Sequence, residues 1–187
     1  MWKCGATETC VERGNNINKK WLLPVCLLLV FGLVVMRPKS MQRRISEEIG
    51  IDVSHAEVLL EMDTHGGFHG DGTSCVVFQL DEETAQTLRC AQEWKQLPMH
   101  ETAQTLLYGV THTTPEGTWT AGPYLRDADE KPLVPHLQSG YYLLLDRHSS
   151  AKPNQDAAEI LRRASINVTI AVYDDTSHIL YVCRLDT

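Results

Sequence analysis

The longest apolar run in the chain lies near its N-terminus. Residues 21–36 contain no charged side chain, and basic residues flank them at Lys19, Lys20, Arg37 and Lys39. A membrane-spanning helix needs about 20 apolar residues, with a range of roughly 17–25, and basic side chains at its ends can extend the span. The run therefore predicts an uncleaved, single-pass signal-anchor helix. A cleaved signal peptide and a buried core helix are the alternatives, but no small residues follow the run to form a peptidase site.

Four later segments alternate apolar and polar side chains with the period of two that is typical of strands. These segments are residues 58–62, 75–80, 166–172 and 179–185. Four glycines lie within residues 63–72, so we expect the first two segments to form a hairpin with a glycine-rich loop. The last two segments predict a second hairpin with one face in the core. Residues 141–145 predict a further, buried strand.

Helical patterns are fewer. The stretch 81–94 begins with three acidic residues, which supply an N-cap and a favourable first turn, and its apolar residues recur on one face. Residues 157–164 carry apolar side chains at helical spacing, whereas the prolines within 109–138 predict a loop or a small hairpin. We therefore expect an α+β domain, with an antiparallel or mixed sheet of about five strands and two to three helices on one face.

One hexapeptide occurs twice in the chain. Glu-Thr-Ala-Gln-Thr-Leu stands at residues 83–88 and again at 101–106. Two copies of six residues are too few for a repeat protein, whose units run about 20–50 residues. We interpret the repetition as coincidence or local duplication.

These patterns predict four parts along the chain. They are an N-terminal tail (1–20), the transmembrane signal-anchor helix (21–36), a basic juxtamembrane segment (37–50) and a soluble α+β domain (51–187). Four basic residues lie on each side of the apolar run, so the positive-inside rule does not decide its orientation. A short tail before a folded domain is the layout of an exported signal-anchor protein. We expect a single-pass protein of the cell membrane with an extracytoplasmic C-terminal domain.

Charge is divided unevenly along the chain. The first 44 residues hold eight Lys or Arg and two Asp or Glu, whereas the remainder holds nine and 22. An acidic body repels phosphate backbones, which excludes a nucleic-acid partner. The body contains Cys75, Cys90 and Cys183, so at most one disulfide could form within it. Buried free thiols are the simplest interpretation of Cys75 and Cys183, because both lie in apolar strands.

The glycine-rich loop carries the strongest candidate chemistry. Imidazole and carboxylate groups together bind zinc or another divalent metal, and the loop supplies four of them: Asp63, His65, His69 and Asp71. The alternative is a structural loop in which the aspartates accept backbone N–H bonds and glycines adopt positive φ, at Gly66, Gly67, Gly70 and Gly72. Short motifs without context are mostly false positives, so we favour the structural interpretation and expect no cofactor.

Residues 146–150 contain the residue types of a catalytic triad in direct succession. Adjacent residues at a strand end cannot supply nucleophile, base and orienting group in one geometry. We expect a solvated strand end in which Asp146 and Arg147 form a weak surface ion pair.

Several separated motifs resemble one known family. They are DTHGGFHGDGTS (63–74), WKQLP (94–98), LYG (107–109), GYYLLLDRHSS (140–150) and IAVYDDTSHILYVCRLDT (170–187). The chain from about residue 20 to 187 is similar to small, single-pass, membrane-anchored proteins of unknown function from Gram-positive, Clostridia-like bacteria. The resemblance implies a bacterial origin and a single-pass anchor, and it brings no activity, cofactor or catalytic residue.

Two functions fit these sequence features. The first is a non-enzymatic, membrane-tethered interaction or sensing domain, whose partners are the lipid bilayer, through residues 21–36, and another protein. The second is a metal-dependent hydrolase that uses the loop of Asp63, His65, His69 and Asp71. We favour the first, because no catalytic motif rises above background.

Overall fold

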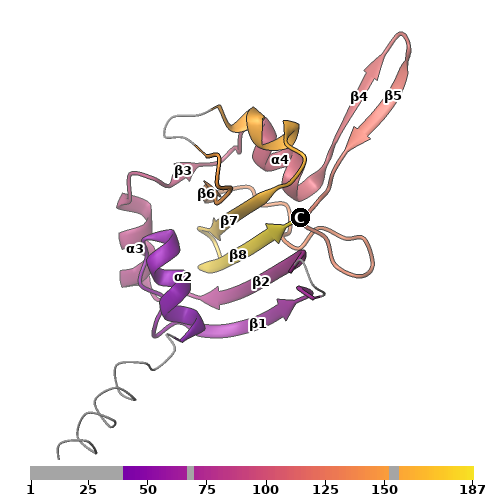
Figure 1. Ribbon diagram of the computed structural model, residues 1–187. Helices are drawn as coiled ribbons and strands as arrows, with labels where there is room; N and C mark the ends of the chain where they lie inside the picture. The colour runs from indigo at the N-terminus through magenta and orange to yellow at the C-terminus, as the bar shows by residue number, and fades with distance from the viewer. Residues whose placement is uncertain (1–39, 67–69, 152–155) are drawn as a thin grey trace, which may run out of the picture. The chain divides into compact units, whose positions relative to one another are not determined.

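The computed structural model describes residues 40–66, 70–151 and 156–187 (Figure 1). Ser40–Thr187 forms one compact unit. The predicted tail and signal-anchor helix lie outside the described residues. Within the described ranges, no helix combines the length and the apolar character that crossing a membrane requires.

Six strands form one antiparallel sheet in the spatial order β1, β2, β8, β7, β6, β3. Their bounds are Glu57–Asp63 (β1), Gly72–Gln79 (β2), Lys95–Gln96 (β3), Gly140–Asp146 (β6), Asn167–Asp174 (β7) and Ile179–Asp186 (β8). Two further strands, Val110–Thr114 (β4) and Gly117–Ala121 (β5), form a hairpin that projects from the domain (Figure 1). The α+β class and the two predicted hairpins are confirmed, and the stretch 109–138, predicted as a loop or a small hairpin, contains the β4–β5 hairpin. The main sheet has six strands rather than about five.

Each helix begins where a side chain accepts a hydrogen bond from a first-turn backbone N–H. The helices, with their capping residues, are α2 Met41–Ile49 (Ser40), α3 Glu82–Cys90 (Asp81), α4 Glu101–Tyr108 (His100) and the 3-10 helix η1 Ala157–Arg162 (Asp156). The helix predicted over 81–94 starts as expected but ends early, because Ala91 has extended backbone angles. Within the stretch 157–164, residues Ala157–Arg162 form a 3-10 helix instead of the predicted α-helix.

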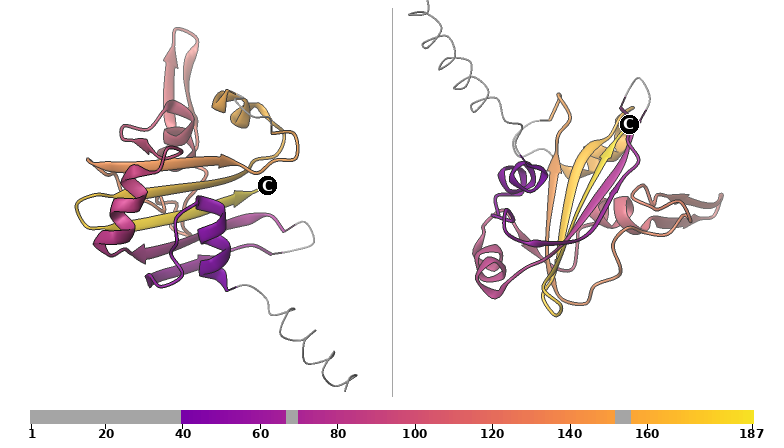
Figure 2. Two further views of the ribbon diagram at one scale, coloured as in Figure 1. Left: turned by 90° about the vertical axis from the view of Figure 1, so that its left-hand side faces the viewer. Right: turned by 90° about the horizontal axis from the view of Figure 1, so that it is seen from below.

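Helices cover both faces of the sheet, so the prediction of helices on one face is wrong. Figure 2 shows α2 and α3 on one face, which we call the α2 face. Its core includes Ile45, Ile49, Phe78, Leu88 and Tyr173. On the opposite face, the α4 face, α4 and η1 pack against strand residues, and this core includes Cys75, Leu106, Ile160, Ile170 and Cys183.

The central strands explain this two-sided core. On β7, Val168, Ile170 and Val172 belong to the α4-face core, and all three are fully buried. The intervening Thr169, Ala171 and Tyr173 are fully buried as well. The expectation that the C-terminal hairpin buries one face is therefore wrong, because small or amphipathic residues at the alternate positions also accept a helix packed over them.

The two copies of the hexapeptide begin two helices. The copy at 83–88 lies in α3 and the copy at 101–106 lies in α4, on opposite faces of the sheet. Their alanine and leucine positions, Ala85, Leu88, Ala103 and Leu106, are all fully buried. The repeated sequence therefore specifies the same amphipathic helical turn twice.

Candidate functional site

Asp63 and His65 meet at the end of β1, as the loop hypothesis requires. The Asp63 Oδ1 atom accepts the backbone N–H of His65 at 2.9 Å and lies 2.6 Å from the Nδ1 atom of its ring. These two contacts, the backbone bond first, hold the pKa of Asp63 below its ordinary value. The Asp63 side chain is 63% exposed, so solvent screens the pair and its contribution to stability is small.

The second ring nitrogen of His65 is also occupied. Its Nε2 atom lies 3.1 Å from the Oδ2 atom of Asp186, the last residue of β8. A carboxylate only accepts hydrogen bonds, so both contacts are hydrogen bonds only when both ring nitrogens carry a proton. A metal ion could bind this ring only by displacing one carboxylate.

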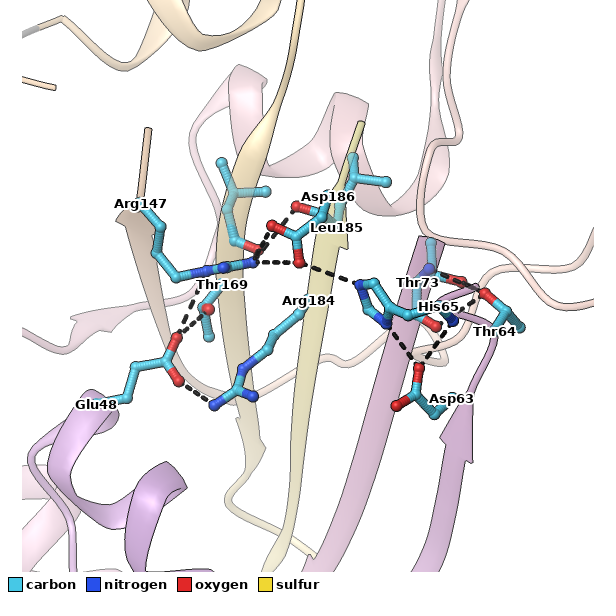
Figure 3. Close-up of polar contacts among 11 residues, drawn as sticks. Glu48, Asp63, Thr64, His65, Thr73, Arg147, Thr169, Arg184, Leu185 and Asp186 are labelled. Carbon is cyan, nitrogen blue, oxygen red and sulfur yellow. Dashed lines mark hydrogen bonds and ion pairs between the residues drawn. The ribbon is translucent and has the colours of Figure 1, made fainter. Parts of the chain in front are cut away.

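Asp186 connects His65 to a larger group of charged side chains, which we call the ionic network (Figure 3). The Arg147 Nη2 atom lies 2.9 Å and 3.0 Å from the two carboxylate oxygens of Asp186, and its Nε atom lies 3.6 Å from Glu48. Glu48, on α2, also accepts from Arg184 on β8 and from the buried hydroxyl of Thr169 on β7. The network therefore fastens α2 and the loop end of β1 to the central strands.

Most of this network was not predicted from the sequence. Glu48, Arg147 and the β8 pair Arg184 and Asp186 come from three different segments, and only tertiary folding brings them to His65. One signal was present, because Arg184 and Asp186 stand two residues apart in an otherwise apolar strand and so share one face. Charged residues at such positions indicate that the strand end is covered by polar partners.

The loop glycines have different roles. Gly70 has a φ of +71°, which confirms the predicted left-handed conformation at that position. Gly72 is needed for close approach, because a Cβ atom there would lie 2.6 Å from the Cα atom of His65. Gly66 does not adopt a positive φ, and Gly67 lies outside the described residues. The structural interpretation is therefore supported at Gly70 and Gly72.

The structure describes three of the four predicted metal ligands. His69 lies outside the described residues, and the Asp71 side chain is exposed while its backbone carbonyl accepts the Gly66 N–H at 3.4 Å. Within residues 40–66, 70–151 and 156–187, no group of three or more His, Cys, Asp or Glu side chains is arranged to hold a metal ion. The metal hypothesis depends on His69 and stays a hypothesis from the sequence.

Asp146 and Arg147 do not form the expected ion pair with each other. Arg147 contacts the ionic network, whereas both oxygens of Asp146 contact Arg163 Nη1, at 2.7 and 2.8 Å. Neighbouring His148 contacts the hydroxyls of Ser150 and Ser165 through its two ring nitrogens. Successive residues at a strand end point to opposite faces, which separates the partners that the sequence places side by side.

A surface hollow of about 460 Å³ lies beside α4. Leucine, proline, methionine and glutamine side chains line it around the stacked rings of Tyr108 and His136. The Tyr108 hydroxyl donates to the carbonyl of Pro135 at 2.9 Å, and burial raises the pKa of Tyr108 to about 12. The lining contains no carboxylate, lysine or arginine, and its polar side chains are those of Tyr108, His136, Gln104 and Gln138.

The outer edge of β1 is the second candidate site. β1 lies at one end of the sheet, and the strand at the other end, β3, has only two residues. The Thr64 N–H donates to the Thr73 carbonyl at 2.8 Å, so this is a hydrogen-bonded pair, and such pairs alternate along an antiparallel ladder. By this alternation the backbone groups of Glu61 and Asp63 point away from β2, toward the free edge.

Apolar side chains remain exposed along this edge. Val58, Leu59 and Leu60 are 37%, 46% and 56% exposed, and Leu59 occupies a β-bulge between the other two. The register places Val58, Glu61 and Asp63 on the α2 face. It places Leu60 and Met62 on the α4 face. Toward the loop end, the edge therefore carries the acidic pair on the α2 face and the apolar pair on the α4 face.

Comparison with known proteins adds no family assignment. No protein family, curated protein or solved structure matches the chain. The resemblance to membrane-anchored bacterial proteins stays an expectation from the sequence motifs, and the functional proposal rests on the geometry of the fold.

Proposed function

We propose that the protein is a non-enzymatic, membrane-tethered interaction domain that binds an extended segment of another protein by strand addition at β1. Residues 21–36 hold it in the cell membrane, and the folded domain lies on the extracytoplasmic side. The observation that carries the proposal is the free β1 edge, with outward backbone groups at Glu61 and Asp63 beside exposed Val58 and Leu60. Strand addition satisfies such backbone groups and covers such side chains together.

The side chains of β1 define the chemistry of the partner. Glu57 and Glu61 form no ion pair with any residue in the part of the chain that the structure describes, so their charges are available. A strand laid beside β1 meets Glu61 and Asp63 on the α2 face and Leu60 and Met62 on the α4 face. Side chains alternate between faces along a strand. The matching partner therefore alternates basic and apolar residues.

A second copy of the chain is a poor partner at this edge. In antiparallel pairing about a two-fold axis, the α2 face of one β1 strand continues into the same face of the other. Pairing centred on Met62 would place Glu61 of each copy opposite Asp63 of the other, and like charges in cross-strand positions are destabilising. The charges of Glu61 and Asp63 and the bulge at Leu59 therefore disfavour the pairing of two β1 edges with each other.

The polar clusters of the domain favour binding over catalysis. Both ring nitrogens of His65 contact carboxylates, and both ring nitrogens of His148 contact serine hydroxyls. The charges of the ionic network fasten α2 and the loop end of β1 to the sheet. These side chains hold parts of the domain in place, and that is the role expected of them in a rigid binding domain.

A peptide-binding experiment tests the proposal. The full-length protein in mild detergent is titrated with a fluorescent, end-capped peptide of alternating valine and lysine, and binding is measured by fluorescence anisotropy. We expect binding that is lost when glutamate replaces lysine in the peptide. Leu60→Asn should weaken binding about tenfold, because burial of a leucine contributes roughly 1.5–3 kcal/mol.

Two variants locate the binding edge. Glu61→Pro removes an outward N–H without removing a bond to β2, and it should abolish binding while the domain still melts cooperatively. Trp119→Asn removes an exposed aromatic side chain from the β4–β5 hairpin and should leave binding unchanged. Equal binding of the lysine and glutamate peptides, no binding of either, or full binding by Glu61→Pro would contradict the proposal.

A further inference from the structure

Two cysteines stand directly opposite each other in the centre of the sheet. Cys75 on β2 and Cys183 on β8 are cross-strand partners, and both side chains belong to the core on the α4 face. They are 2% and 0% exposed, and both are free thiols in the structure. The third body cysteine, Cys90, is exposed at the end of α3.

The hydrogen-bond pattern fixes the type of this pair. Near the other end of the ladder, the Leu80 N–H donates to the His178 carbonyl at 2.9 Å, which makes that pair hydrogen-bonded. The β2–β8 register has no shift, and hydrogen-bonded pairs alternate with non-hydrogen-bonded ones. Cys75 and Cys183 lie five positions from the Leu80–His178 pair along this ladder. Because five is an odd number, the cysteines form a pair of the other, non-hydrogen-bonded type.

Such a pair has the spacing of a disulfide. The Cα atoms of a non-hydrogen-bonded pair lie about 4.5 Å apart, and their side chains are closer together than those of the alternative pair. Disulfides join Cα atoms about 4.4–6.8 Å apart. The register therefore already places the two strands at a Cα separation that a disulfide can bridge.

We propose that Cys75 and Cys183 are a redox site that forms a cross-strand disulfide when the chain folds in an oxidising compartment. The oxidant is a small or protein disulfide. One cysteine thiolate attacks it and releases one thiol, and the second cysteine thiolate then attacks the mixed disulfide, forms the Cys75–Cys183 bond and releases the other thiol. Two protons and two electrons leave the cysteines, and the oxidant becomes two thiols.

Because both thiols become buried, the pair is oxidised or left reduced while the chain folds. Thiol–disulfide exchange requires a thiolate and access to it, and burial raises the pKa of the Cys183 thiol. The reduced pair in the folded domain therefore reacts slowly with oxidants, whereas the same thiols are accessible in the unfolded chain. The pair lies in the centre of the sheet, so its chemistry is independent of binding at β1.

Refolding in a defined redox buffer tests the inference. Full-length protein is reduced in denaturant and refolded in detergent with glutathione and glutathione disulfide. Free thiols are then alkylated in denaturant, and the digest is analysed by mass spectrometry. We expect a disulfide-linked pair of peptides containing Cys75 and Cys183, with Cys90 alkylated. The oxidised protein should also melt at a higher temperature than the reduced protein.

Single variants and native-state labelling complete the test. Cys90→Ser should keep the bond, and Cys183→Ser should leave Cys75 alkylated. In the reduced, folded protein, Cys90 should react with a thiol reagent at least tenfold faster than Cys75 and Cys183. Alkylation of both Cys75 and Cys183 after oxidative refolding, or their linkage to other cysteines, would overturn the inference.

Discussion

Two glycines near the ends of β1 and β2 are required for different physical reasons. Gly70 has a left-handed φ of +71° with open space around its Cα atom, so its requirement is conformational. Gly72 lies against the backbone of Thr64 and His65, so its requirement is steric. Gly66 meets only one atom, the Thr64 carbonyl oxygen at 3.9 Å, and has neither requirement.

Alanine substitution should separate these reasons. Gly72→Ala forces the backbone of His65 to move and should lower the free energy of unfolding by about 2 kcal/mol or more, as overpacking does. Gly70→Ala should cost about 1 kcal/mol for the left-handed conformation, and Gly66→Ala should cost less than either. Urea denaturation measures all three. Equal costs for Gly66→Ala and Gly72→Ala would contradict the described loop geometry.

Asp146 and Arg163 form a largely buried ion pair at the end of β6. Their side chains are 18% and 13% exposed, and the Arg163 Nη2 atom is buried without a partner among the described residues. Burial raises the pKa of Asp146, but the Arg163 contact and the His148 N–H outweigh it and hold the pKa below its ordinary value. The ionised carboxylate is therefore favoured by folding.

Asp146→Asn should cost about 1.5–3 kcal/mol near neutral pH, because it removes a hydrogen bond between charged groups. Because the pKa of Asp146 is lower in the folded state than in the unfolded state, the ionised carboxylate stabilises the fold at any pH above the unfolded pKa of about 3.9. This stabilisation is lost as the pH falls through the folded pKa. The difference between wild type and variant should therefore shrink below about pH 4. Urea melts across pH measure it. Glu159→Gln, in the exposed pair with Arg162, is the matched control and should cost little at any pH.

At the scale of elements, α2 is part of the folded domain rather than a connecting segment. Ile45 and Ile49 are each 2% exposed in the core of the α2 face, and the Trp94 indole N–H donates to the Ile49 carbonyl at 3.2 Å. The ionic network adds a polar attachment through Glu48. The compact unit accordingly begins at Ser40.

Truncation tests the role of α2. A chain of residues 40–187 should melt cooperatively, whereas residues 51–187 should lose two buried isoleucines worth roughly 1.5–3 kcal/mol each. The summed loss of about 3–6 kcal/mol reaches the lower end of the total stability of a small domain, about 5–15 kcal/mol. We expect the shorter chain to melt at a much lower temperature or without a cooperative transition. Equal melting temperatures would show that α2 is dispensable.

The predictable elements are those that local sequence determines. The alternating segments gave both long hairpins, and the acidic start of α3 marked its first turn. The second hexapeptide, at 101–106, carries the same signal as the first, yet α4 was not predicted because the repeat was interpreted as coincidence. The two-sided core could not be predicted from alternation, because Ala171 and Thr169 read as polar-face residues until a helix is known to cover them.

The candidate sites follow the same division. Asp63 and His65 are two residues apart and meet through local geometry, so the sequence could pair them. Asp186 reaches His65 only because β8 lies beside β2, and this sheet order depends on long-range packing. The free β1 edge is also a property of sheet order. An exposed aliphatic run such as Val58 to Leu60 reads as core until the strand is known to lie at the edge.

At the scale of the whole molecule, the outer edge of β1 has no partner strand among the described residues, and residues 21–36 are the proposed tether. The other sheet edge is a strand of two residues paired with β6, and helices cover both faces. Strand addition at β1 would extend the sheet without disturbing either core. Binding there leaves the ionic network and the cysteine pair in place.

Backbone hydrogen exchange at β1 tests strand addition most directly. Amide exchange of the full-length protein is followed by nuclear magnetic resonance with and without the valine–lysine peptide. Because the Glu61 and Asp63 N–H groups face the free edge, we predict that saturating peptide slows their exchange at least tenfold. The Met62 N–H already faces β2 and should change much less. Unchanged exchange at Glu61 and Asp63, or new protection confined to the β4–β5 hairpin, would contradict strand addition at β1.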